Sequence, residues 1–154
     1  MKTINMLKYL FVIGTTLSMA GFAHGADNCT GHDSLVVIYA ETLDLGSGHT
    51  LTAFRQASII TSDSKLYNLA TGECSGAALT TPDGKLRVFG YCARRDTDGD
   101  TQSIEFSQAP GADKGMWKST GGTGKFAGKS DSGWYQDVRT DGNMTVSLWG
   151  GNCK

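Results

Sequence analysis

The sequence has little of what the common metal and catalytic sites are made of. Its 154 residues include four cysteines and three histidines, but no Cys-x-x-Cys pair of the kind that holds structural zinc. No serine stands in the Gly-x-Ser-x-Gly elbow of a hydrolase, and no segment after the N-terminal stretch has helical periodicity. We therefore expect no metal, no cofactor and no catalytic residue, and we interpret the chain as a binding or structural module.

Basic residues are also too few and too dispersed for a nucleic-acid partner. Residues 1–25 hold two of the 14 basic residues and none of the 15 acidic ones, so residues 26–154 carry 12 basic against 15 acidic groups and a net charge near −3. A chain that binds a phosphate backbone shows a basic patch instead. We expect no nucleic acid among the partners.

The first 25 residues are typical of a secretory signal peptide. Lys2 and Lys8 form a positively charged start, an apolar stretch follows from Leu10 to Ala23, and small residues stand at Ala23 and Gly25. The stretch is too short for a good membrane span, although an uncleaved anchor is the alternative. We expect residues 1–25 to be removed and residues 26–154 to form one secreted or periplasmic domain without a membrane span.

Four cysteines in an exported chain indicate two disulfides, for which three connectivities are open. The turn Pro82-Asp83-Gly84 separates two β-rich segments, and a three-residue loop there sets the register of a hairpin. That register places Cys74 opposite Cys92 at a non-hydrogen-bonded site, within disulfide range. We predict the bond Cys74–Cys92, which leaves Cys29–Cys153 to join the chain ends.

Two more turns, Thr97-Asp98-Gly99 and Thr140-Asp141-Gly142, have the same chemistry. The same loop geometry predicts the facing pairs Cys92–Ile104, Gly90–Phe106, Trp134–Leu148, Gln136–Val146 and Val138–Met144. Each register gathers largely apolar side chains on one face, and a one-residue slip would scramble them. The outward aromatic side chains would suit a protein partner; they are Phe89, Tyr91 and Trp149.

Eight segments are rich in β-branched, aromatic or alternating residues: 35–43, 50–60, 66–80, 85–95, 100–107, 115–121, 131–138 and 143–150. Eight antiparallel strands in a domain of this size suit an all-β closed barrel, which leaves no exposed edge. The alternative is a β-sandwich.

A run of glycines follows the sixth of these segments: Gly121, Gly122, Gly124, Gly128 and Gly133. Its start resembles a phosphate loop, but the Walker pattern needs a glycine where Ser119 stands and a hydroxyl where Phe126 stands. The run is also too rich in glycine for a helix or strand interior. We interpret it as a structural corner of the barrel, with Lys125-Phe126-Ala127 as its plug.

This glycine corner, the segment Gly90-Tyr91-Cys92 and the turn at 96–100 together resemble the allene oxide cyclase and dirigent-like barrels, most of all small exported bacterial barrels of that superfamily. The resemblance covers about residues 72–150. It implies an interior apolar cavity open at one end and often a homo-oligomer. We therefore expect a module for a small apolar ligand or a protein partner. The alternative is a cyclase-like or dirigent-like enzyme that steers a reactive apolar intermediate, although none of the family's pocket residues can be matched to a position here.

Six polar residues are candidates for contact with a ligand: Tyr39, Glu41, Arg55, Arg94, Gln102 and Gln136. The first three would line the cavity if the strands 35–43 and 50–60 turn them inward. If the strands instead turn these three residues outward, they would be exposed and an ion pair among them would contribute little. We favour this alternative because charged residues are rarely buried. Arg94 and Gln102 would lie at a barrel mouth, and Gln136 would need an interior hydrogen-bond partner.

The segment Asp96-Thr97-Asp98-Gly99-Asp100 spaces three carboxylates like the start of a calcium loop. A full loop needs glycine at position six and glutamate at position twelve, where this chain has Thr101 and Ser107. We therefore interpret the segment as a solvated hairpin turn.

Overall fold

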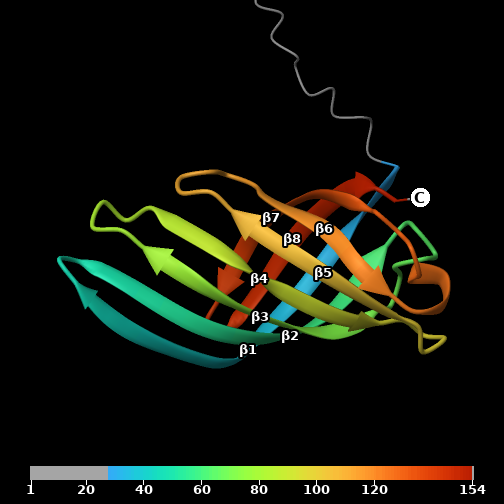
Figure 1. Cartoon of the computed structure of the whole chain (residues 1–154), viewed down its shortest axis with the longest axis horizontal. Coiled ribbons are helices and arrows are strands. Elements are labelled where there is room, and N and C mark those ends of the chain that lie inside the picture. Colours follow the sequence, from blue (N-terminus) through green and yellow to red (C-terminus); the bar gives the residue numbers. More distant parts are fainter. Residues whose placement is uncertain (1–27, 154) are drawn as a thin grey trace, which may run out of the picture.

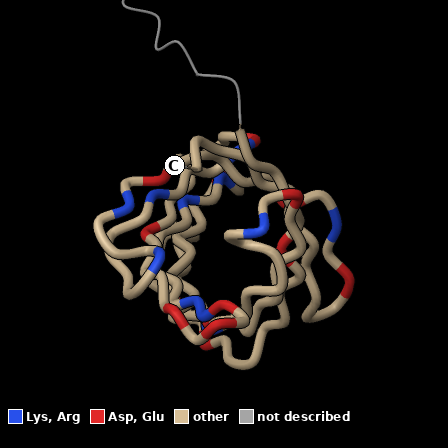
Figure 2. Tube along the Cα trace, turned by 90° about the vertical axis from the view of Figure 1, so that its right-hand side faces the viewer, with Lys and Arg blue, Asp and Glu red and all other residues tan. Residues whose placement is uncertain are grey.

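The computed structural model describes residues 28–153, which form a closed barrel of eight antiparallel strands (Figure 1). The strands are β1 (Cys29–Gly46), β2 (His49–Ser62), β3 (Thr71–Thr80), β4 (Leu86–Arg95), β5 (Thr101–Gln108), β6 (Gly115–Gly122), β7 (Ser132–Asp141) and β8 (Met144–Asn152). Each pairs with its neighbour in the chain, and β8 pairs with β1, so the chain forms a ring when viewed along the barrel (Figure 2). The predicted barrel is confirmed, and the sandwich alternative is wrong.

The expected signal peptide at residues 1–25 lies outside the described residues. Within residues 28–153, no helix is long and apolar enough to cross a membrane. The strand expected over 66–80 begins only at Thr71, because residues 63–70 form a turn that precedes it.

Both disulfides have the predicted connectivity. Cys74 and Cys92 are cross-strand partners on β3 and β4, with their Cα atoms 4.0 Å apart. The second bond joins Cys29 to Cys153, near the two ends of the described chain, with a Cα separation of 6.0 Å. The pairs Cys92–Ile104 and Gly90–Phe106 are confirmed as well.

The predicted register of the third hairpin is wrong. β7 and β8 turn over two residues, with Asp141 opposite Met144, and a bulge at Val138 shifts the register again. Tyr135 therefore pairs with Trp149, and both are on the inner face, whereas a three-residue loop predicted Trp134 there. The three predicted pairs that fail are Trp134–Leu148, Gln136–Val146 and Val138–Met144.

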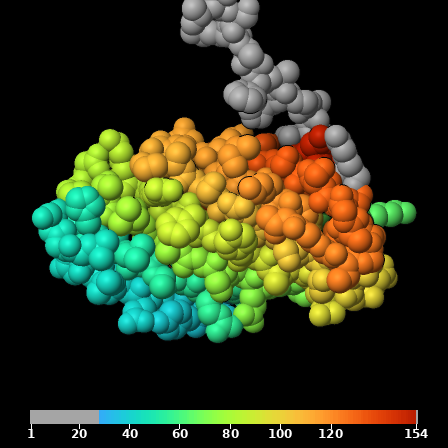
Figure 3. All heavy atoms as spheres, viewed as in Figure 1, coloured from blue at the N-terminus to red at the C-terminus, as the bar shows by residue number. Residues whose placement is uncertain are grey.

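The two ends of the barrel differ in their connections. Four hairpin turns lie at one end, which we call the open end; they are residues 47–48, 81–85, 109–114 and 142–143. The first two of these turns lie toward the left of the molecule in Figures 1 and 3. The other end, called the closed end, carries the disulfide Cys29–Cys153 and the connections 63–70, 96–100 and 123–131.

Aromatic side chains fill the closed end. Tyr67 from the β2–β3 connection and Phe126 from the glycine corner are each only 2% exposed, and their ring centroids are 5.9 Å apart. Tyr67 also meets Trp149 edge to face at 5.6 Å. Phe126 is thus buried as the plug interpretation predicts.

Gly133 and Gly124 show why the corner requires glycine. A Cβ atom at Gly133 would collide with the backbone carbonyl of Gly150 on β8. Gly124 has a φ of +48°, and a Cβ there would collide with the carboxylate of Asp100. The corner can therefore pass close to β8 and the β4–β5 turn only because these side chains are missing.

Candidate functional site

The inner face of the barrel encloses a cavity of about 240 Å³. Alternate residues of each strand point inward, so every second position of the strands contributes to its wall. The wall is mainly apolar; it includes Leu35, Phe54, Ala78, Leu86, Val88, Ile104 and Phe106. The disulfide Cys74–Cys92 and the ring of Trp117 complete this surface.

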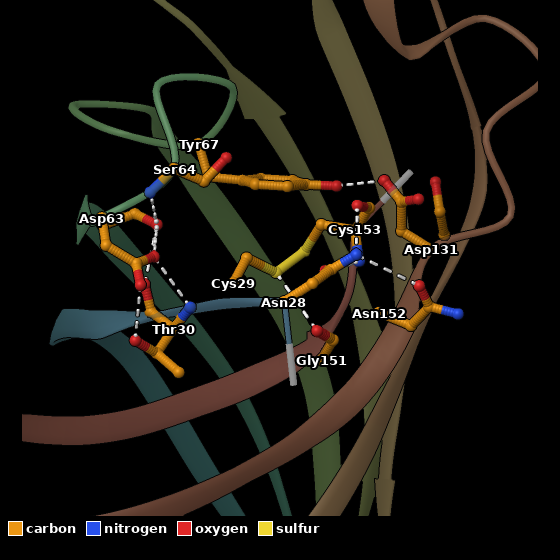
Figure 4. Close-up of a disulfide and its surroundings, with 12 residues drawn as sticks. Asn28, Cys29, Thr30, Asp63, Ser64, Tyr67, Asp131, Gly151, Asn152 and Cys153 are labelled. Carbon is orange, nitrogen blue, oxygen red and sulfur yellow. Dashed lines mark hydrogen bonds between the residues drawn. A yellow bond between two sulfur atoms is a disulfide. The ribbon is translucent and has the colours of Figure 1, made fainter. Parts of the chain in front are cut away.

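A hydrogen-bonded network closes the cavity at the closed end. The hydroxyl of Tyr67 donates to the carboxylate of Asp131, close to the disulfide Cys29–Cys153 (Figure 4). The buried amide of Gln102 donates to the Tyr67 oxygen and to Ser119, both at 3.4 Å. Burial and the bond to Asp131 raise the pKa of Tyr67, so the phenol stays a neutral donor.

The cavity reaches the surface at the open end. Leu86, at the start of β4, lines the cavity and is 40% exposed. Asp137 on β7 lines it too and is exposed. A ligand would therefore enter past the hairpin turns.

Polar side chains form one row on the cavity wall. Asp33 on β1 and Asp137 on β7 both pair with Ser147 on β8, which lies between them, and all three line the cavity. The hydroxyl of Ser147 donates to Asp137. The structure thus brings two carboxylates to one side of the barrel.

The deeper carboxylate forms an ion pair across the lumen. Arg94 Nη2 on β4 lies 2.6 Å from Asp33 Oδ2, and both side chains are largely buried. Burial raises the pKa of Asp33, although the Arg94 guanidinium opposes the shift. The cavity therefore combines an apolar wall with the carboxylate of Asp33, whose burial is only partly compensated by Arg94.

The six candidate residues are distributed between the interior and the outer surface. Arg94 lines the cavity, and Gln102 is buried next to the cavity wall. Their predicted position at a mouth is wrong, because residues 63–70 and 123–131 cover this end. Gln136 lies on the outer face opposite Leu148, so its predicted interior position is also wrong.

The other three candidates lie on the outer face of β1 and β2. Tyr39 donates a hydrogen bond to Glu41, and both are exposed. Arg55 forms an exposed ion pair with Glu73 at 2.6 Å. Their exposure agrees with the alternative favoured from the sequence, but Leu35 on the same strand lines the cavity, because a bulge between Val37 and Tyr39 exchanges the two faces of β1.

The predicted outward aromatic set is confirmed in part. Phe89 and Tyr91 on β4 are 45% and 61% exposed. Trp149 is 6% exposed and points inward, because the register of the third hairpin differs from the predicted one.

Sequence reasoning missed the polar row formed by Asp33, Asp137 and Ser147. Asp33 precedes the first expected strand, which in the structure begins at Cys29. Asp137 and Ser147 were placed on the wrong face by the register of the third hairpin. The alternation of Tyr135, Asp137 and Arg139 in the sequence indicates that they could share one face of a strand. Only the bulge at Val138 shows which of them face the cavity.

The acidic turn binds a side chain of the glycine corner. Lys125 Nζ lies 2.6 Å from Asp96 and 2.8 Å from Asp98, and the backbone N–H of Lys125 donates to Asp100. Within residues 28–153, no group of three or more His, Cys, Asp or Glu side chains is arranged to hold a metal ion. The turn and the corner, which are separate motifs in the sequence, thus form one contact.

No family model matches the sequence, and no curated protein is similar to it. Among solved structures, the barrel is similar to that of a pterocarpan synthase dirigent protein, with a TM-score of 0.52 and 16% identity. The match covers 94% of this chain and 96% of that chain. At this identity the similarity concerns the fold, so the chain has a dirigent-like barrel.

Proposed function

We propose that this protein is an exported module that binds a small, largely apolar molecule inside its barrel. The observation that carries the proposal is the cavity of about 240 Å³. It exceeds the cavity of roughly 150 Å³ that suffices for benzene in a protein core. Its wall is apolar and aromatic with few polar groups, as is usual for pockets that take small molecules.

Two further observations support this function. The dirigent-like barrel favours a binding or stereo-directing role for the interior. The two disulfides suit an oxidising compartment, which is consistent with export of the mature chain.

Steering of a reactive intermediate is the alternative function. The sequence offered Glu41 and Arg55 as interior groups for it, but both are on the outer surface. The ion pair Arg94–Asp33 is in the cavity, yet a ligand site needs such a polar anchor as much as an enzyme does. We therefore retain binding as the proposed function.

Titration with naphthalene, followed by the methyl NMR signals of Ala78 and Val88, tests the proposal. We expect both signals to shift in a saturable way, because both residues line the cavity. The variant Ala78→Trp fills the cavity and should abolish the shift at Val88. Ala77→Trp is the matched control, since Ala77 neighbours Ala78 but points to the outer face. Unchanged binding by a folded Ala78→Trp variant would contradict the proposal.

A further inference from the structure

The charged groups that line the cavity do not balance. They are two carboxylates, Asp33 and Asp137, and one guanidinium, Arg94. The remaining lining residues are apolar or neutral polar side chains. With all three groups ionised, the interior carries one negative charge in excess.

The carboxylate oxygens are also not all used by the protein. Asp33 is 5% exposed, and its Oδ2 is held by Arg94, whereas its buried Oδ1 has no donor in good hydrogen-bond geometry, although the Ser58 hydroxyl lies beside this carboxylate. Asp137 accepts one hydrogen bond, from Ser147, on Oδ1. A buried carboxylate oxygen is stabilised by a donor, and most by a charged one.

Part of the cavity wall is aromatic. Phe106 on β5 lies 6.4 Å from Phe54 and 6.3 Å from Tyr135, measured between ring centroids. Aromatic faces attract cations as well as apolar groups. An anionic ligand would meet two carboxylates here, whereas a cationic one would form charge-assisted hydrogen bonds with them.

Resting on the proposed function, we propose that the ligand is a small protonated amine with an apolar body. Its ammonium group would bind in the row formed by Asp33, Ser147 and Asp137, and its apolar body would pack against Phe54 and Phe106. An alkylammonium group is charged at neutral pH and supplies up to three donors. It therefore provides a positive charge and hydrogen-bond donors to the carboxylate side of the cavity.

Calorimetric titration with three ligands of similar shape tests this inference. The probes are 2-phenylethylamine, 2-phenylethanol and 3-phenylpropanoate, at neutral pH. We expect the amine to bind about tenfold tighter than the alcohol or better, because a charge-assisted hydrogen bond is roughly twice as strong as a neutral one. We expect the carboxylate to bind most weakly.

Two variants of β7 locate the site. Asp137→Asn removes the excess charge while keeping an acceptor for Ser147, so the preference for the amine should fall by about tenfold. Asp141→Asn makes the same chemical change on the same strand at a fully solvated position, and should leave the preference unchanged.

The outcomes separate the inference from the proposed function. Equal affinity for the amine and the alcohol, or an undiminished preference in Asp137→Asn, overturns the amine proposal and leaves the apolar binding function standing. If 3-phenylpropanoate binds more tightly than the amine, the amine proposal is likewise overturned and the apolar binding function stands. If neither these probes nor naphthalene binds, both proposals are overturned.

Discussion

Lys125 Nζ lies 2.6 Å from the carboxylate of Asp96, whose side chain is only 2% exposed, and this contact fastens the glycine corner to the β4–β5 turn. Lys118 forms a comparable ion pair with Glu105 at 2.9 Å, but on the open surface. The two lysines therefore make a matched pair, one with a buried partner and one with an exposed partner.

We predict that Lys125→Met lowers the urea midpoint of unfolding and that Lys118→Met leaves it almost unchanged. The first substitution leaves a buried carboxylate without its counter-charge, whereas exposed ion pairs contribute little. Equilibrium unfolding of both variants by urea checks this. Equal midpoints for the two variants would show that the corner is not held by this contact.

Asp96 also predicts a dependence of stability on pH. Although burial disfavours its ionised form, the ammonium of Lys125 and the N–H groups of Asp98 and Asp100 hold its pKa below the usual 3.8. The folded state therefore binds this proton less readily than the unfolded state, so the stabilisation is complete above about pH 5 and is lost as the pH falls through 3.8 and below. We expect the stability of Asp96→Asn to vary less than that of the wild type between pH 5 and pH 2.5. Parallel curves from urea unfolding would contradict the assignment.

Two glycines of the corner should respond differently to alanine. Gly133→Ala forces a Cβ against the carbonyl of Gly150, and overpacking of this kind costs about 1–3 kcal/mol. At Gly121 nothing lies within 4 Å of the added Cβ, and the φ angle is negative. Gly121→Ala should therefore be neutral or slightly stabilising, by up to about 1 kcal/mol. Thermal unfolding followed by circular dichroism distinguishes the two, and equal destabilisation would contradict the role assigned to Gly133.

The phenol of Tyr67 should contribute to the stability of the closed end. Tyr67→Phe removes a donor from the buried carboxylate of Asp131 and a partner from Gln102, which costs about 1–3 kcal/mol. Tyr91→Phe removes the same hydroxyl from a residue that is 61% exposed, so it should change stability little. Denaturant unfolding of the two variants gives the comparison. A loss confined to Tyr91→Phe would rule out the network as a stabilising element.

The sequence predicted the barrel because its local signals agree with the long-range pairing. The turns at 82–84 and 97–99 fix the register of their hairpins, and alternation then carries that register along each strand to Cys92. The third turn has the same Asp-Gly chemistry but a two-residue connection and a bulge at Val138. The length of this turn and the position of the bulge cannot be predicted from the residue types. Together they exchange the predicted inner and outer faces of β7.

The cavity residues were harder to predict for the same reason. Arg94 lies on a strand whose register the first hairpin fixes, and it was identified as a candidate. Asp33 and Asp137 come together only because β8 lies between β1 and β7, which is a property of barrel closure. Whether an acidic residue on an amphipathic strand faces inward thus depends on pairs far apart in the sequence.

The two disulfides should differ in their contribution to stability because they close loops of different length. Cys29 and Cys153 are 124 residues apart in the sequence, and Cys74 and Cys92 are 18 apart. The loss of loop entropy in the unfolded chain predicts a cost of roughly 5 kcal/mol for Cys29→Ser/Cys153→Ser and roughly 3 kcal/mol for Cys74→Ser/Cys92→Ser. Urea unfolding of the two double variants measures both costs, and peptide mapping without reduction verifies the remaining bond in each. The reverse order of costs would mean that the Cys74–Cys92 bond stabilises the cavity wall of the folded barrel by more than it restricts the unfolded chain.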